Sequence, residues 1–255
     1  MRQTVPRPGS PRWWQGRPDR DNGGGQGPGR PAMPAERVIA AAVELVDEVG
    51  PVDFSMRLLA QRLQSSTATL YRHFASKDEI FVHVVEHVLG QVPRHLTDTA
   101  ETATWQERLF AIADALFRTL REHPTVVSLF NRHIPLGPHG LAGRETAIGI
   151  MLSSGFSPEA AAKAYTAVAH YVIGFASQLG AHGNDGPAED QDIREFYRSL
   201  DPARYPATVV SASFLPSSLD DEFRFGLQLI VDGLATQLTA ASTPTVTSPH
   251  APDVA

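Results

Sequence analysis

The chain of 255 residues contains no cysteine, which excludes a disulfide framework, a thiolate zinc site and a cysteine nucleophile. It also lacks an apolar run of the roughly 18 residues that a membrane-spanning helix needs. No apolar segment follows Arg2 and Arg7, so we expect no secretory signal and a cytoplasmic location. Hydrophobic residues still make up 42% of the chain, enough to build a core. We therefore expect a soluble, folded protein that does not contact a membrane.

Lysine is scarce too, because 20 of the 22 basic residues are arginine and only Lys77 and Lys163 are lysine. The charge is unevenly spread: residues 1–80 carry a net charge of +2, and the remainder carries −8. A mildly basic front on an acidic body fits a head that binds nucleic acid and a body that does not. A charge of +2 alone does not identify such a head.

The two ends of the chain have compositions that predict disorder. Residues 1–34 contain 7 glycines and 7 prolines and carry a net charge of +4. Such a segment cannot bury enough apolar surface to offset its ordering entropy. We interpret it as a solvated tail, with a basic arm along DNA phosphates as the alternative. Residues 242–255 are interpreted as a second disordered tail.

Between the tails, apolar residues recur at helical spacing, and no stretch alternates with a period of two. Serine and threonine caps mark several helix starts, among them Thr104 with Glu107 and Ser157 before Pro158. We predict an all-α fold, with a three-helix head over residues 35–80 and a larger helical domain over 81–241. The main predicted helices cover about 36–49, 55–63, 66–73, 76–91, 104–122, 141–154, 157–181, 190–200 and 218–240.

The segments 55–63 and 66–73 are short helices joined by a tight turn, which is the pattern of a helix-turn-helix. Its second helix offers hydroxyl, aromatic, guanidinium and imidazole groups, which can reach base edges and phosphates. Ser66 begins this helix, where free backbone N–H groups can meet a phosphate. An ordinary helical hairpin with a polar surface is the alternative. The predicted inner faces consist of Leu59, Ala60, Leu63, Leu70 and Phe74.

The run Thr69-Leu70-Tyr71-Arg72-His73-Phe74, followed by Lys77-Asp78-Glu79, resembles the recognition helix and the next helix of the tetracycline-repressor (TetR) family. Later segments, such as Trp105 to Leu109 and Phe225 to Leu234, resemble the C-terminal domain of the tetracycline-repressor subgroup. The resemblance covers roughly residues 35–240. It implies a homodimeric, ligand-responsive regulator, a repressor that binds a double-stranded DNA operator and a small-molecule effector.

The resemblance also implies roles for single residues. Arg57 would reach the major groove, Thr67, Thr69, Tyr71 and His73 would contact bases or backbone, and Lys77 would hold a phosphate. Arg72 is added from its chemistry, since arginine reads guanine bidentately; a phosphate contact or a free surface position is the alternative. The family often has glycine in the turn where this chain has Gln64. A left-handed backbone there costs a non-glycine residue on the order of 1 kcal/mol.

The body is expected to dimerise through the helices Ser157–Ala181 and Ser218–Ala240, packed as a four-helix bundle. Such a dimer reads a palindrome whose half-sites lie about 34–36 Å apart, or a multiple of that distance. Pro93 and Phe130 stand where the tetracycline repressor has drug- or magnesium-binding histidines. Tetracycline–magnesium is therefore not expected as the effector. By analogy with the family we expect a bulky hydrophobic or polyketide-like effector, and no cofactor. The pocket candidates, each alternatively a core residue, are Phe117, Phe130, His133, Met151, Tyr165 and His170.

A rival pattern is His83-Val84-Val85-Glu86-His87, which fits the H-x-x-E-H motif of some zinc peptidases. Its two imidazoles lie one helical turn apart, with Glu86 as a candidate base. A helical metal-dependent hydrolase is thus the alternative from another class, and a regulator-like protein without specific DNA binding is a third. The histidine pair could also make DNA binding sensitive to metal or pH. We assign no catalytic and no metal-binding residue.

Overall fold

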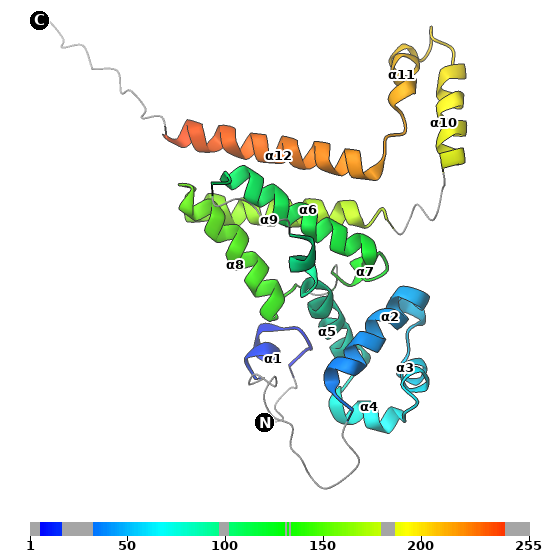
Figure 1. Cartoon of the computed structure of the whole chain (residues 1–255), viewed down its shortest axis with the longest axis vertical. Coiled ribbons are helices and arrows are strands. Elements are labelled where there is room, and N and C mark those ends of the chain that lie inside the picture. Colours follow the sequence, from blue (N-terminus) through cyan, green and yellow to red (C-terminus); the bar gives the residue numbers. More distant parts are fainter. Residues whose placement is uncertain are drawn as a thin grey trace, which may run out of the picture.

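The computed structural model describes residues 6–16, 33–96, 102–130, 132, 134–179 and 187–242. Within these residues the chain forms helices and no strand, so the predicted all-α class is confirmed (Figure 1). None of the helices in this part of the chain is long and apolar enough to cross a membrane.

The head consists of α2 (Ala35–Asp53), α3 (Met56–Arg62) and α4 (Thr67–His73). Gly50 breaks α2 with a φ of 74°, where the sequence predicted an end. Ser55 and Ser66 cap α3 and α4 by accepting hydrogen bonds from Leu58 N and Thr69 N. The predicted inner faces are confirmed, because all five of their side chains are buried.

The turn of the helix-turn-helix is left-handed at Gln64, the position whose geometry the sequence left open. Gln64 has a φ of 50°, in the left-handed region. The amide of the next residue, Ser65, donates to the carbonyl of Ala60 at 2.9 Å. This closed turn fixes the angle at which α4 leaves α3, so glutamine supports the geometry despite its strain.

Helix α5 (Lys77–Leu89) leads from the head into the body, followed by the short 3₁₀ helix η1 (Val92–His95). The body contains α6 (Trp105–Glu122), α7 (Val127–Phe130), α8 (Pro138–Ser153), α9 (Pro158–Ala176) and α12 (Leu219–Ser242). Helix α6 packs against α8, α9 and α12, as Figure 1 shows. Aromatic rings fill the space between these helices: Phe117 and Phe223 stack at 3.9 Å, and Tyr171 stacks on Phe223 at 5.5 Å.

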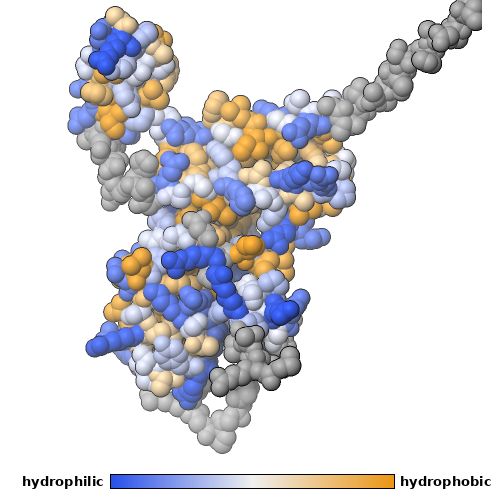
Figure 2. Space-filling model, turned by 180° about the vertical axis from the view of Figure 1, so that it is seen from behind, coloured by the Kyte–Doolittle hydropathy of each residue, from blue (hydrophilic) through white to orange (hydrophobic). Residues whose placement is uncertain are grey.

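An arm of α10 (Pro187–Ser199), α11 (Pro206–Ser211) and the 3₁₀ helix η2 (Ala212–Phe214) projects from the body before α12 (Figure 1). The sequence predicted α10 but neither α11 nor η2, and it extended α9 to Ala181, whereas α9 ends at Ala176. The arm helices pack mainly on each other. Phe196, Val210 and Phe214 therefore stay exposed on it, and the arm has orange patches in Figure 2.

The predicted N-terminal tail is not wholly without structure. Residues 11–15 form the short helix α1 (Pro11–Gln15), capped by Ser10. Its two tryptophans, Trp13 and Trp14, pack against His83 of α5. Indole rings bury a large apolar area each, which composition averaged over 34 residues conceals. Residues 1–5 and 17–32 of this tail, and the second tail from residue 243 onward, lie outside the described residues, and the basic-arm alternative is not tested.

Candidate nucleic-acid interface and body cavity

Helix α4 presents the predicted contact groups at the surface of the head. Ser66, Thr67, Tyr71 and Arg72 are exposed, and Tyr71 has 54% of its surface accessible. Thr69 and His73 are half-buried, and Arg57 is exposed on α3. Buried Leu70 anchors the opposite side of α4. The helix-turn-helix thus brings these side chains to the surface on two adjoining helices.

Local hydrogen bonds orient two of these groups. Ser66 Oγ lies 3.0 Å from Thr69 Oγ1, and Ser66 Oγ also accepts from Thr69 N at 3.1 Å. The Arg72 guanidinium donates to Thr69 Oγ1 at 3.3 Å. The cap of α4 is therefore continuous with the arginine that the sequence singled out.

Lys77 is engaged inside the protein. Its ammonium donates to the carbonyl of Phe54 at 2.6 Å and lies over the rings of Phe54 and Phe81. Burial lowers the pKa of Lys77 from its ordinary value. Lys77 thus ties the start of α5 to the end of α2, a role that the sequence did not predict.

The H-x-x-E-H residues occupy the joint between head and body. Glu86 is buried, and its two carboxylate oxygens accept hydrogen bonds from His139 N at 2.9 Å and Gly140 N at 3.2 Å, at the start of α8. His83 packs among aromatic rings. Burial lowers the pKa of His87. Among the described residues no group of three or more His, Asp or Glu side chains could hold a metal ion. Glu86 therefore caps the start of α8.

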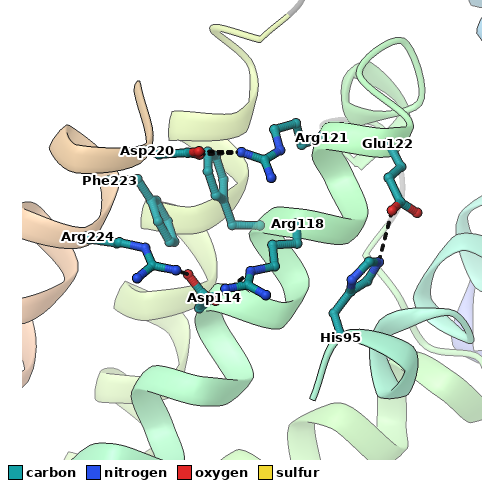
Figure 3. A pocket seen from close by; sticks show the side chains of 9 residues that line it. His95, Asp114, Arg118, Arg121, Glu122, Asp220, Phe223 and Arg224 are labelled. Carbon is teal, nitrogen blue, oxygen red and sulfur yellow. Dashed lines mark hydrogen bonds and ion pairs between the residues drawn. The ribbon is translucent and has the colours of Figure 1, made fainter. Parts of the chain in front are cut away.

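A cavity of about 290 Å³ opens between α6, η1 and the start of α12 (Figure 3). Asp114 lies between two arginines, 2.8 Å from Arg118 Nε and 3.1 Å from an Arg224 nitrogen. Arg121 pairs with Asp220 on the same cavity. The lining combines these ion pairs with two stacked aromatic rings, and it consists of His95, Asp114, Phe117, Arg118, Arg121, Glu122, Asp220, Phe223 and Arg224.

The predicted pocket residues do not gather around this cavity. Phe117 lines it, whereas Phe130 and Met151 are buried in the core. Tyr165 is half-buried beneath the Arg144 guanidinium, and His170 is exposed. His133 lies outside the described residues. The charged lining was missed because arginines that face a cavity and arginines that face solvent give the same pattern in sequence.

Comparisons with known proteins identify the two parts of the chain. Residues 38–84 match the family described as bacterial regulatory proteins, tetR family, and residues 98–238 match the tetracyclin repressor-like C-terminal domain. The HTH-type transcriptional repressor DrrR1 of Streptomyces coeruleorubidus is 30% identical over 80% of this chain and 78% of that protein. An HTH-type transcriptional regulator of Saccharopolyspora erythraea is 29% identical over 81% of this chain and 86% of that protein.

Solved structures with a similar fold belong to regulators of the same kind. Apo ActR from Streptomyces coelicolor superposes with a TM-score of 0.73 at 25% identity, covering 84% of this chain and all of that one. ActR in complex with actinorhodin superposes with a TM-score of 0.70 at 26% identity, covering 81% of this chain and 98% of that one. These matches show that the chain belongs to the TetR family of ligand-responsive, DNA-binding transcriptional regulators.

Proposed function

We propose that the protein is a homodimeric repressor that releases a palindromic operator when a small molecule binds in its body. One observation carries this proposal: α4 exposes polar side chains at the head surface, and α5 joins that head to a body with a cavity. A ligand shifts such an equilibrium only through its different affinities for the two conformations. We place this activity in the cytoplasm, where operator DNA is accessible.

In the complex with DNA, α4 enters the major groove. Tyr71 and Thr67 contact base edges or the backbone, and Arg72, steadied by Thr69, reads guanine or holds a phosphate. Arg57 reaches the groove from α3. His73 and Ser66 add contacts to the DNA from the two ends of α4. Lys77 binds a phosphate if its ammonium turns away from Phe54.

The dimer forms through α9 and α12. Phe225 and Leu229 of α12 are 69% and 57% exposed, a large apolar surface for one helix. Open space surrounds the Cβ positions of Gly174 on α9 and Gly233 on α12, which favours close approach of a partner helix. Two copies packed on these helices present two α4 helices to successive major grooves, about 34–36 Å apart or a multiple of it.

The effector occupies the cavity between α6 and α12. The arginines favour a ligand that carries a carboxylate or phenolate, and the almost fully buried Phe117 and Phe223 form the apolar part of the lining. Such an anion would replace Asp114 as a partner of Arg118 or Arg224. The actinorhodin complex of ActR supports an aromatic ligand in this fold. Pro93 and Phe130 have no side-chain atom that coordinates a metal ion, so we do not expect tetracycline–magnesium.

The operator is tested by selecting bound sequences from random DNA with the purified protein, at a stated salt concentration near physiological. A recovered palindrome is the expected result. Sequence-blind binding that disappears as salt rises would contradict it, because phosphate contacts alone give affinity without specificity.

The effector site is tested with actinorhodin as the probe and the selected operator as the readout. We expect the probe to release DNA from the wild-type protein and to act less on Phe117→Ala and Arg224→Gln. The control is Arg204→Gln, on the arm and away from the cavity. Equal responses of all four proteins would exclude the cavity as the site of this ligand.

A further inference from the structure

Helix α1 lies at the junction of head and body, beside α5 and below α8 in Figure 1. The rings of Trp13 and Trp14 contact each other edge to face at 4.8 Å. Both reach His83 of α5, at centroid distances of 5.7 and 6.0 Å. His83 in turn contacts Phe74, at the end of α4, with centroids 5.6 Å apart. A continuous chain of rings thus leads from α1 to the recognition helix.

Trp14 also lies beside the body. Trp14 borders a small cavity together with Val82, Val85 and Glu86 of α5 and with the loop of residues 134–136 before α8. The Arg7 guanidinium donates to the carbonyl of Arg132 at 3.2 Å, close to that loop. The indole Nε1 of Trp14 is buried with no hydrogen-bond partner among the described residues. Packing rather than hydrogen bonding therefore holds this ring in place.

We propose that Trp13 and Trp14 are positioning residues for operator recognition, which brace α5 against the loop of residues 134–136 and hold the end of α4 through His83. This inference rests on the proposed function, since it presumes a specific operator. The brace restricts the orientations of the head relative to the body. Without it, a smaller fraction of molecules holds α4 in the orientation that fits the operator, and the apparent affinity falls in proportion.

A brace and a DNA-contacting arm predict different salt dependences. Replacing the tryptophans removes no charge, so the slope of log affinity against log salt stays constant when α1 acts as a brace. Arg12 is exposed on the same helix and carries the charge that a phosphate-contacting arm would use. Gln15 is exposed there as well and serves as the matched control.

The experiment compares full-length wild type, Trp13→Ala/Trp14→Ala, Arg12→Ala and Gln15→Ala in titrations of the selected operator at several salt concentrations. We expect the double variant to bind about tenfold more weakly at every concentration, with the wild-type slope. The Gln15→Ala protein should bind as wild type does. Three outcomes for the double variant would overturn the brace: an operator affinity within twofold of that of Gln15→Ala, tighter binding than wild type, or a changed salt slope.

Hydrogen exchange on the free protein tests the brace without DNA. In the double variant we expect faster exchange in residues 77–89 and 134–140, and unchanged exchange in α9 and α12. The milder Trp13→Phe/Trp14→Phe variant keeps aromatic contacts. Its exchange rates should lie between those of wild type and the double alanine variant, which separates a lost brace from a misfolded chain. If no operator is recovered, the proposed function fails, and unchanged exchange in residues 77–89 then separately rejects the brace.

Discussion

Asp47 of the head and His123 of the body form a contact across the joint, with 2.6 Å between Asp47 Oδ2 and His123 Nδ1. Thr125 donates to the other carboxylate oxygen of Asp47 at 3.0 Å. His123 Nε2 lies 3.3 Å from Gln91 Oε1, just beyond the end of α5. One carboxylate on α2 thus meets the segment that follows α6, so head and body are joined by more than the covalent chain.

Replacing Asp47 should loosen this joint. We expect Asp47→Ala to lower the free energy of unfolding by about 1–3 kcal/mol, because the partly buried His123 and Thr125 lose a charged acceptor. Chemical denaturation measures the change. Glu44→Ala on the same helix removes an exposed pair with Arg62 and should cost less than about 1 kcal/mol. Equal losses in both variants would contradict a special role for Asp47.

Two glycines near the start of α8, Gly137 and Gly143, allow a test of the cap that Glu86 provides. A Cβ on Gly137 would lie 2.3 Å from Glu86 Cδ, so Gly137→Ala must displace a buried carboxylate that caps α8. We expect a loss of about 1–3 kcal/mol in the free energy of unfolding. Gly143→Ala lies within α8 in open space and should be neutral or stabilising by up to about 1 kcal/mol. Similar effects of the two substitutions would refute the close contact.

His87 should make stability depend on pH. Burial is the main cause that lowers its pKa below the usual 6.5; His123, Arg94 and His139 add repulsion, and Glu36 opposes the shift. Below about pH 6.5 the unfolded state therefore binds more protons than the folded state does. The stability that neutral His87 contributes is complete above about pH 6.5 and is lost as pH falls through the folded-state pKa. We expect wild type to lose more stability than His87→Gln between about pH 7 and 5. Parallel stability curves for the two proteins would count against this burial effect.

Tyr71 tests the recognition helix directly. Its ring is exposed on α4, so Tyr71→Ala should leave the fold intact and weaken operator binding by about 1–3 kcal/mol at fixed salt. Tyr205→Ala, on the arm, controls for loss of a surface aromatic ring. Sedimentation should show the same oligomeric state for both variants. Unchanged operator affinity in Tyr71→Ala would show that this face of α4 does not contact the operator.

Leu229 tests the proposed dimer. A charge at this exposed position on α12 would be buried between two copies, so Leu229→Glu should shift the protein toward monomer in sedimentation equilibrium. Leu152→Glu introduces the same charge at an exposed site on α8 and should leave the assembly unchanged. A dimer that withstands Leu229→Glu would place the interface elsewhere.

Elements that depend on local signals could be predicted from the amino-acid sequence. Ser66 and Thr104 predicted two helix starts, and both side chains cap the predicted helices. These signals span three or four residues, the range over which a cap or a helical repeat acts. The DNA-contact assignments on α4 come mainly from the resemblance to the TetR family and stay predictions.

Contacts between side chains that are distant in the sequence could be seen only in the folded structure. Glu86 finds its partners more than 50 residues away, at the start of α8, and so it caps a helix although its motif suggested a hydrolase. The cavity combines α6 with α12, where Arg121 and Asp220 are 99 positions apart. Trp13 and Trp14 lie in a segment whose composition predicted disorder, and packing on α5 orders them. Such contacts depend on the mutual packing of whole helices, and no short stretch of sequence carries that information.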